Sequence, residues 1–281
     1  MAEIFESILI VFVNPLKGRD LSLDDWYTNI HIRDVMRIEG GISAQRFIAS
    51  DDQLKLDGKT GVSDHKAHTI FEWESAEKSV VGHIERAGTP AMLHTRDCFF
   101  GDEVGGYFRP VHLSDGWSRE NGFKRGLDLL TVLITTSNYD KGEFVSWFRN
   151  KHAPATLAMP GFASAALFEV HEATKRQSLP KDFPYSFAAF YGMSNRQSAL
   201  IAWSARHDQR DPLDLSTQAD GVKATCWEPR TVRILRESVL HPSPEAVAEE
   251  RRAHLVQQGR FYSRDDLEKL LIEGKPPQTS E

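Results

Sequence analysis

The chain has 281 residues, of which 40% are hydrophobic and 26% charged, and its formal net charge is −6. This composition is typical of a globular protein and argues against disorder. Because no basic patch dominates, we expect neither nucleic acid nor an anionic membrane as a partner. No apolar run reaches the roughly 18 residues of a membrane span. Cys98 and Cys226 lack metal-site spacing, which favours a reduced cytoplasmic setting.

The first part of the chain alternates between strand-like and helix-like segments. Short β-branched and aromatic runs ended by turn residues indicate strands, and apolar residues at helical spacing indicate helices. Ser22 and Ser75 are expected as N-caps, and Gly40-Gly41 as a helix stop. The expected order is a strand over 9–13, a helix over 23–38, strands over 42–49 and 68–73, a helix over 75–87, and a fourth strand from 93–100 and 107–113. This is the β-α-β-β-α-β order of a ferredoxin-like unit.

The second part repeats that order. We expect strands over 129–135, 162–171, 185–191 and 225–235, and helices over 143–159 and 194–205. Two further helices, over 242–258 and 263–274, are expected in a C-terminal tail. The predicted organisation is therefore two domains, 5–113 and 127–237, followed by a helical tail over 242–281.

A direct repeat supports the two-domain interpretation. Residues 26–47 and 147–168 align without gaps, and seven of the 22 aligned positions are identical. A repeat with this long period indicates two copies of one domain rather than a solenoid. The identical pairs are Trp26/Trp147, Asn29/Asn150, His31/His152, Gly40/Gly161, Ser43/Ser164, Ala44/Ala165 and Phe47/Phe168.

The repeated segments resemble a known superfamily. A helix carrying Trp-x-x-x-x-His, followed by Pro-Gly-Phe and a strand, resembles the dimeric α/β-barrel superfamily, and WFRNKHAPATLAMPGF in the second copy is most similar to its EthD-like branch. The resemblance implies an α+β fold, in which tandem ferredoxin-like domains pack sheet to sheet as an intrachain α/β barrel. The first copy departs from the pattern, with Ile32-Arg33 and Glu39-Gly40 in place of Ala153-Pro154 and Pro160-Gly161. The two halves are therefore expected to have diverged, with one site retained.

The strand sequences favour the same arrangement independently. Several strands are apolar at consecutive positions, so both of their faces are expected to be buried. A closed barrel with outer helices would bury both faces. The residues concerned in the first copy are Ile10, Val11, Phe12, Val13, Ile70, Phe71 and Trp73.

The repeated histidines, His31 and His152, are the first candidates for chemistry. An imidazole can act as a general acid or base near neutral pH. Tyr27 and Phe148 lie four residues earlier and share a helix face with them. The alternative is a structural histidine that bonds a carbonyl between helix and sheet. Pro154 removes an amide donor close to His152, so we expect a bend there.

His65 and His68 form a second candidate pair just before and within a first-half strand. Either could transfer a proton. The His-x-x-His spacing also suggests a metal, but residues three apart on a strand point to opposite faces and no cysteine or carboxylate cluster accompanies them. We therefore expect no metal and no cofactor. His83 and His94 are expected in surface or packing roles.

Arg46 is the candidate anion holder. The aligned residue in the second copy is Leu167, so a charge here indicates a polar cavity in the first half or an exposed strand face. A guanidinium can bind a carboxylate with two hydrogen bonds. We predict that Arg46, His65, His68 and His31 converge in the first half. The predicted pocket walls are Trp26, Tyr27, Phe71 and Trp73, with Tyr107 and Arg109 as further substrate contacts.

The function expected from these residues is acid–base chemistry on a small aromatic or phenolic acid. No phosphate-binding glycine loop and no nucleophile elbow is present. The first expectation is a cofactor-independent lyase of the decarboxylase or dehydratase type. Two alternatives stay open: a cofactor-free or haem-assisted oxygenase of aromatic compounds, and a non-catalytic, stress-related ligand-binding barrel. The sequence also leaves open a homodimer.

Overall fold

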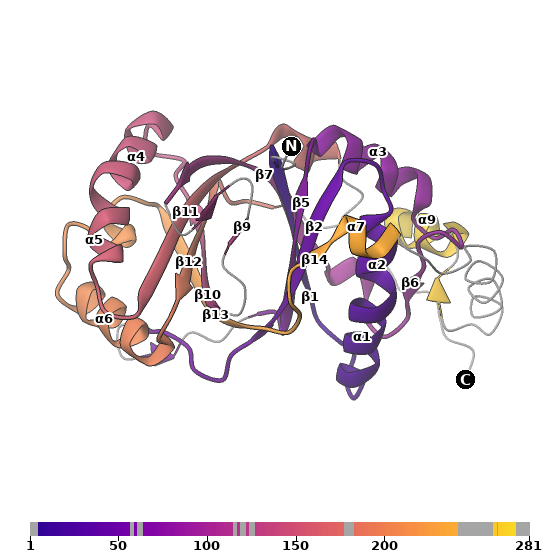
Figure 1. The fold of residues 1–281 in the computed structure, drawn as a ribbon, viewed down its shortest axis with the longest axis horizontal. Helices are drawn as coiled ribbons and strands as arrows, with labels where there is room; N and C mark the ends of the chain where they lie inside the picture. The colour runs from indigo at the N-terminus through magenta and orange to yellow at the C-terminus, as the bar shows by residue number, and fades with distance from the viewer. Residues whose placement is uncertain are drawn as a thin grey trace.

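The centre of the molecule is a closed antiparallel barrel (Figure 1). The computed structural model describes residues 5–56, 59–60, 64–114, 117–118, 122–123, 127–176, 183–240, 261–262 and 264–273. The barrel strands of the first half are β1 (Ser7–Val13), β2 (Gly41–Ala49), β5 (Ala67–Trp73) and β7 (Val104–Leu113). Those of the second half are β10 (Asp128–Thr135), β11 (Phe162–Val170), β12 (Phe187–Met193) and β13 (Gly221–Pro229).

The strand order is the same in both halves. The sheet runs β7-β1-β5-β2 in the first half and β13-β10-β12-β11 in the second. The barrel closes where β7 pairs with β11 and where β13 pairs with β2. The expected α+β barrel is confirmed, and it is closed by hydrogen bonds at both sheet edges, which join the two sheets into one continuous sheet.

Helices cover the outer face of the barrel on two opposite sides (Figure 1). The first half contributes α1 (Asp20–Trp26), a π-helical turn η1 (Tyr27–His31), α2 (Ile32–Met36) and α3 (Ala76–Arg86). The second contributes α4 (Lys141–Trp147), a π-helical turn η3 (Phe148–His152), α5 (Ala153–Leu157) and α6 (Arg196–Asp208). Ser75 caps α3 as predicted, through a hydrogen bond that its Oγ accepts from the Glu77 amide.

Two local expectations were wrong. The first helix begins at Asp20 after the cap residue Arg19, so Ser22 lies inside it. The π-helical turn before Pro154 also occurs before Ile32 in the first half, where no proline stands. Proline is therefore not its cause. A π turn bonds residues five apart, which matches the Trp-x-x-x-x-His spacing: the Trp26 and His31 rings stack at 4.5 Å, and the Trp147 and His152 rings lie 5.2 Å apart.

Shorter elements connect these parts. They are β3 (Lys55–Leu56), β4 (Lys59–Thr60), β6 (His94–Thr95), η2 (Phe100–Asp102), β8 (Trp117–Ser118), β9 (Gly122–Phe123), η4 (Glu172–Arg176), η5 (Leu215–Thr217), β14 (Ile234–Leu235) and α7 (Arg236–Leu240).

The C-terminal segment packs on the first half. Here β15 (Phe261–Tyr262) pairs with β6, and α9 (Arg264–Glu273) follows. Arg96 forms an ion pair with Asp266 at 3.0 Å. The helix expected over 242–258 lies outside the described residues. Among the helices that the structure describes, none is long and apolar enough to cross a membrane.

Three apolar clusters divide the core. One fills the barrel and includes Ile10, Phe12, Phe47, Phe168 and Trp227. The other two lie between the barrel and the helices, one in each half. The strands β1, β5 and β12 are buried along their whole length, so both of their faces are covered, as their sequences predict. Side chains that point inward and side chains that point toward the helices belong to two separate environments.

A buried ion pair ties a segment after β13 to the first half. Arg233 pairs with Glu72 of β5, and its Nε also donates to Ser43 Oγ of β2 at 2.8 Å. Removal of one partner from a buried pair is strongly destabilising, whereas replacement of both by apolar residues is often neutral. We predict that Glu72→Leu lowers the free energy of unfolding by about 3–5 kcal/mol.

The matched control is the double variant Glu72→Leu/Arg233→Met, which should recover most of that loss in urea denaturation. A single variant that costs less than about 1 kcal/mol, the scale of an exposed pair, would contradict this assignment.

Candidate functional site

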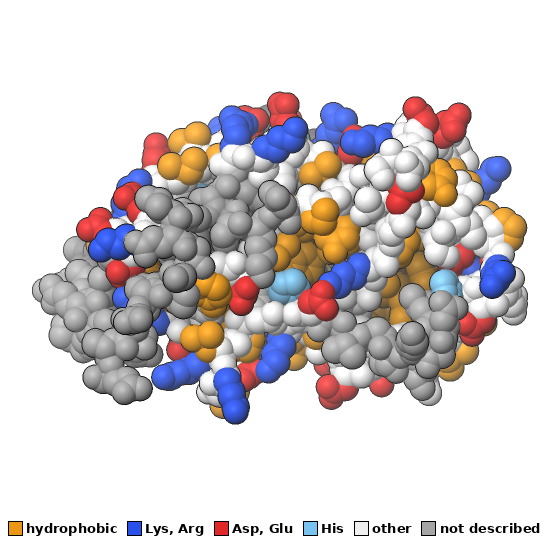
Figure 2. Space-filling view, turned by 180° about the vertical axis from the view of Figure 1, so that it is seen from behind, with side chains coloured by type: hydrophobic (Ala, Val, Ile, Leu, Met, Phe, Trp, Pro, Cys, Tyr) orange, Lys and Arg blue, Asp and Glu red, His pale blue; other side chains and the backbone are white. Residues whose placement is uncertain are grey.

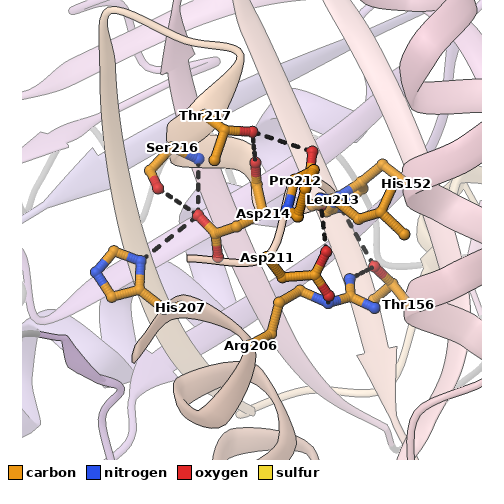
Figure 3. A network of polar contacts seen from close by, with 10 residues as sticks. All are labelled: His152, Thr156, Arg206, His207, Asp211, Pro212, Leu213, Asp214, Ser216 and Thr217. Atoms are coloured by element: carbon orange, nitrogen blue, oxygen red, sulfur yellow. Dashed lines mark hydrogen bonds and ion pairs between the residues drawn. The ribbon is translucent and has the colours of Figure 1, made fainter. Parts of the chain in front are cut away.

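The second-half histidine belongs to a hydrogen-bond network, of which Figure 3 shows the part around Leu213, Thr156 and Arg206. His152 Nδ1 donates to the Leu213 carbonyl at 2.6 Å, so in the neutral ring Nε2 is the acceptor. Tyr191 Oη lies 2.7 Å from Nε2 and donates to it. Thr156 Oγ1 lies 3.3 Å from the same nitrogen and accepts from Arg206 Nη1 at 2.8 Å. Burial lowers the pKa of His152 to about 4. His152 therefore makes the carbonyl contact that the structural alternative predicted.

The first half lacks this network because its partner residues differ. Tyr191 of β12 pairs with Leu130 and Ala165 of the neighbouring strands. The counterparts of these two residues in the first half are Leu9 and Ala44. Both pair with Phe71 of β5. The hydroxyl that donates to His152 Nε2 thus has no counterpart in the first half. The unpartnered His31 nitrogen is Nδ1, whose counterpart in His152 donates to the Leu213 carbonyl. Neither His31 Nδ1 nor Trp26 Nε1 has a hydrogen-bond partner among the described residues. A buried polar atom without a partner costs about 1–3 kcal/mol, so this half carries a cost that the other half avoids.

Ionisable groups are concentrated beside His31. The His94 ring lies 5.5 Å from His31, and Cys98 Sγ lies 3.6 Å from Glu103 Oε1. Burial lowers the pKa of His31 well below its usual value, and the nearby His94 lowers it further. Burial also raises the pKa of Glu103 to about 8. At neutral pH the layer between the barrel and the first-half helices therefore holds neutral imidazoles and a mostly protonated carboxyl group.

Arg46 lies where this layer meets a surface groove. Its side chain is only 2% exposed, its Cζ lies 4.2 Å above the Tyr27 ring, and its Nε donates to Asp24 at 3.3 Å. Arg46 Nη1 has no partner among the described residues. The second half has buried, apolar Leu167 at this position. One guanidinium nitrogen at the edge of the groove is thus a buried donor without a partner among the described residues.

The groove has a volume of about 720 Å³, within the range of small-molecule sites. Its apolar wall includes Leu23 and Ile48, and its polar residues include Asp24, Arg46 and His65. Arg230, which also lines it, donates through Nε to Asp24 Oδ2 at 2.6 Å. The groove therefore combines an unoccupied guanidinium donor, an imidazole and an apolar surface.

The structure separates residues that were predicted to converge. Arg46 and His65 share the groove, but His68 lies inside the barrel, stacked on Phe47 at 4.9 Å. Successive strand residues point to opposite faces, so His68 and the helix-facing His31 are on different sides of one sheet. His31 does not line the groove either, because Tyr27 lies between it and Arg46. The predicted four-residue cluster is wrong.

Two other predicted contacts are also wrong. Arg109 is exposed and forms an ion pair with Glu169 at 2.6 Å across the seam between β7 and β11. Tyr107 is buried, and its hydroxyl lies 2.8 Å from Ser79 Oγ. The aromatic residues Trp26, Tyr27, Phe71 and Trp73 do share one helix-facing cluster. They line the buried layer and not the groove.

Sequence reasoning gave Cys98 and Glu103 no role in a site, and it assigned His94 to a surface or packing role. They lie in or beside the segment between α3 and β7, which the repeat does not cover. The one sequence feature that could have pointed to them is that their segment lies outside the repeat. Such a segment can carry chemistry that the repeated scaffold lacks. Among the described residues, no group of three or more histidine, cysteine or acidic side chains is placed to hold a metal ion.

Comparison with known proteins establishes the fold. The sequence matches no protein-family model and no curated protein. An anthrone oxidase-like protein superposes with a TM-score of 0.58 at 13% identity, covering 85% of this chain and 96% of that one. A protein from Fusobacterium nucleatum, provisionally named a monooxygenase, superposes with a TM-score of 0.51 at 12% identity, covering 82% and 95%. The chain therefore has the fold of these ferredoxin-like α/β-barrel structures.

The difference between the two histidines predicts opposite effects of matched substitutions. Tyr191→Phe removes the hydroxyl that His152 accepts from, and should lower the free energy of unfolding by about 1–3 kcal/mol. Phe71→Tyr adds a hydroxyl at the matched position, in a layer where His31 Nδ1 and Trp26 Nε1 lack partners, and should raise the free energy of unfolding by about 1 kcal/mol. Urea denaturation of both variants tests this pair. Destabilisation by Phe71→Tyr as large as that by Tyr191→Phe would contradict the equivalence of the two positions.

Glu103 predicts a pH dependence of stability. Its pKa is raised from 4.5 to about 8, so the folded state retains a proton that the unfolded state loses. The resulting stabilisation is complete below pH 4.5 and is lost as the pH rises to about 8. Within that window the free energy of unfolding should fall by at most about 1.4 kcal/mol per pH unit.

Stability should be measured above pH 6.5. The pKa values of the buried histidines are lowered from 6.5, so these histidines change the free energy of unfolding only below pH 6.5. Glu103→Gln should flatten the decline between pH 6.5 and 8.5 in urea titrations. An unchanged slope in this variant would show that another group is responsible.

Proposed function

We propose that the chain is an oxygenase that acts on an electron-rich aromatic compound of the anthrone or phenol type, with its working site in the first half. The observation that carries the proposal is Arg46: a buried guanidinium with an unpartnered Nη1 at the edge of a groove, where the second half has Leu167. The anthrone oxidase-like and monooxygenase neighbours support an oxygenase over the lyase expected first from the sequence.

The chemistry that these residues suit starts with proton removal. The ring methylene of an anthrone lies between two aryl rings, opposite the ketone, and is acidic because its anion is conjugated through those rings with the ketone oxygen. Arg46 Nη1 would donate a hydrogen bond to that oxygen and stabilise the anion. His65, the imidazole that lines the groove, would accept the proton. His31, predicted as the proton carrier, is farther from the groove, behind the Tyr27 ring.

The overall reaction balances with molecular oxygen alone. The anion transfers an electron to O₂, and a carbon–oxygen bond then forms to give a peroxide anion, which takes the proton back from His65. His65 then removes the second methylene proton as the O–O bond breaks, and returns it to the departing hydroxide. The methylene becomes a ketone, and the second oxygen atom leaves as water.

The haem-assisted alternative does not fit the buried layer. A haem needs a histidine nitrogen facing a large open space. The rings of Trp26, Tyr27 and His94 lie within 4.5 to 5.5 Å of the His31 ring and fill its surroundings.

We also propose the finer relationships that the sequence suggested. The two halves, 5–113 and 127–237, are a fused pair of ferredoxin-like units of the EthD-like branch. The shared strand order supports this proposal. Since one chain already closes the barrel, a homodimer is not needed to complete the site, and sedimentation would measure whether one forms.

Turnover of anthrone under air and under nitrogen tests the reaction class. We predict oxygen uptake with one equivalent of anthraquinone formed. Release of carbon dioxide or water from an aromatic acid without oxygen would support the lyase instead, and absence of both activities would support the non-catalytic barrel.

Variants of the two groove residues test the mechanism. Arg46→Lys keeps the charge but loses the fork geometry, and should lower kcat/KM about tenfold, or about 1.4 kcal/mol. His65→Gln should lower kcat roughly 100-fold, as expected for loss of a general base. Arg149→Lys and His112→Gln are matched controls outside the groove. Full activity in Arg46→Ala would contradict the assignment of Arg46.

A further inference from the structure

A second hollow lies at one mouth of the barrel, on the other side of the sheet from the buried His31 layer. Its volume is about 400 Å³, and its apolar lining includes Phe12, Leu133 and Trp227. These are barrel-filling residues, so the hollow is a continuation of the barrel interior. Figure 2 shows a hydrophobic hollow near the centre of one face, beside a histidine and adjoining basic and acidic side chains.

Two of its lining residues carry buried polar atoms without partners. Thr131 is 2% exposed and Trp227 is 0% exposed. Neither Thr131 Oγ1 nor Trp227 Nε1 has a hydrogen-bond partner among the described residues. Because such an atom costs about 1–3 kcal/mol, two of them in the wall of one hollow indicate a missing hydrogen-bonding guest.

The charges at this mouth restrict what that guest can be. Lys223 lines the hollow, but its ammonium is already paired with Asp64, which also lines it. Asp102 adds a second carboxylate. The lining therefore has no surplus of positive charge, and an anion would meet two carboxylates.

The wall is also flat and aromatic. Phe12 lies 6.0 Å from Trp227 and 5.5 Å from His65, measured between ring centroids. Aromatic rings bind a planar guest by offset or edge contacts. Trp227 Nε1 can only donate a hydrogen bond, and the Thr131 hydroxyl can donate or accept.

We propose that the barrel mouth is a second ligand site, which takes a neutral, planar aromatic molecule carrying a hydroxyl or carbonyl oxygen. The oxygen accepts from Trp227 Nε1 and exchanges a hydrogen bond with Thr131 Oγ1. This site goes beyond the proposed oxygenase, because Arg46 and its groove lie on the outer side of the sheet. His65, which lines both hollows, is the residue through which the two sites adjoin.

The test is calorimetric titration of the full chain with 2-naphthol, a neutral planar alcohol. We expect saturable binding. Thr131→Val keeps the volume but removes the hydroxyl, and should weaken binding at least fivefold. Thr225→Phe adds a ring to another lining residue and should abolish it. Thr136→Val is the matched control, because Thr136 is equally buried with an unpartnered Oγ1 but does not line the hollow.

The competing explanation, a tolerated packing defect, predicts different results. It predicts that Thr131→Val raises the free energy of unfolding and leaves 2-naphthol affinity unchanged. Absence of saturable binding to the wild-type chain, or equal affinity for the anion 2-naphthoate, would also overturn the proposal. Arg46→Lys should leave 2-naphthol binding unchanged, and weaker binding in that variant would instead place the probe in the groove. Loss of oxygenase activity alone would not affect these outcomes.

Discussion

Hydrogen bonding at two seams determines the rest of this structure. The pairs β7–β11 and β13–β2 join two four-stranded sheets into one closed barrel, in which each barrel strand has a partner on both sides. Closure gives every strand two buried faces and so separates the inward side chains from the helix-facing ones. Most of the interior is occupied by aromatic and aliphatic groups. Polar side chains suited to chemistry therefore lie in the layers beneath the helices, in the groove at the edge of the first-half layer and at a mouth of the barrel.

The two layers beneath the helices use one scaffold in different ways. In the second half, His152, Tyr191 and Thr156 satisfy one another, and Leu167 keeps the strand face apolar. In the first half, Phe71 replaces the tyrosine and so lacks its hydroxyl, and the charged Arg46 replaces the leucine. This layer holds buried polar atoms without partners among the described residues, including His31 Nδ1 and Arg46 Nη1, and each such atom costs stability. Such a cost is typical of sites where function competes with stability.

The sequence predicted the scaffold well because its signals are local. Alternation, caps and the repeat placed most barrel strands and the main helices close to their observed positions. The Trp-x-x-x-x-His spacing also encoded the π turn, although it was interpreted as an ordinary helix. The site was predicted less well, because the side of the sheet on which a residue lies depends on register. His68 and Arg46 were assigned to one cluster, yet one points into the barrel and the other toward the helices. His94 and Glu103 carried no periodic signal at all.

The presence of both halves in one chain has a consequence for how this protein can change. In a barrel made from two identical subunits, every substitution appears twice, so a buried charge introduced for function would be introduced on both sides. Here Arg46 exists once, and Leu167 holds the symmetry-related position. Mutations can therefore accumulate independently in the two halves. A single-chain barrel can carry a destabilising residue in one half while the other half keeps its stabilising contacts.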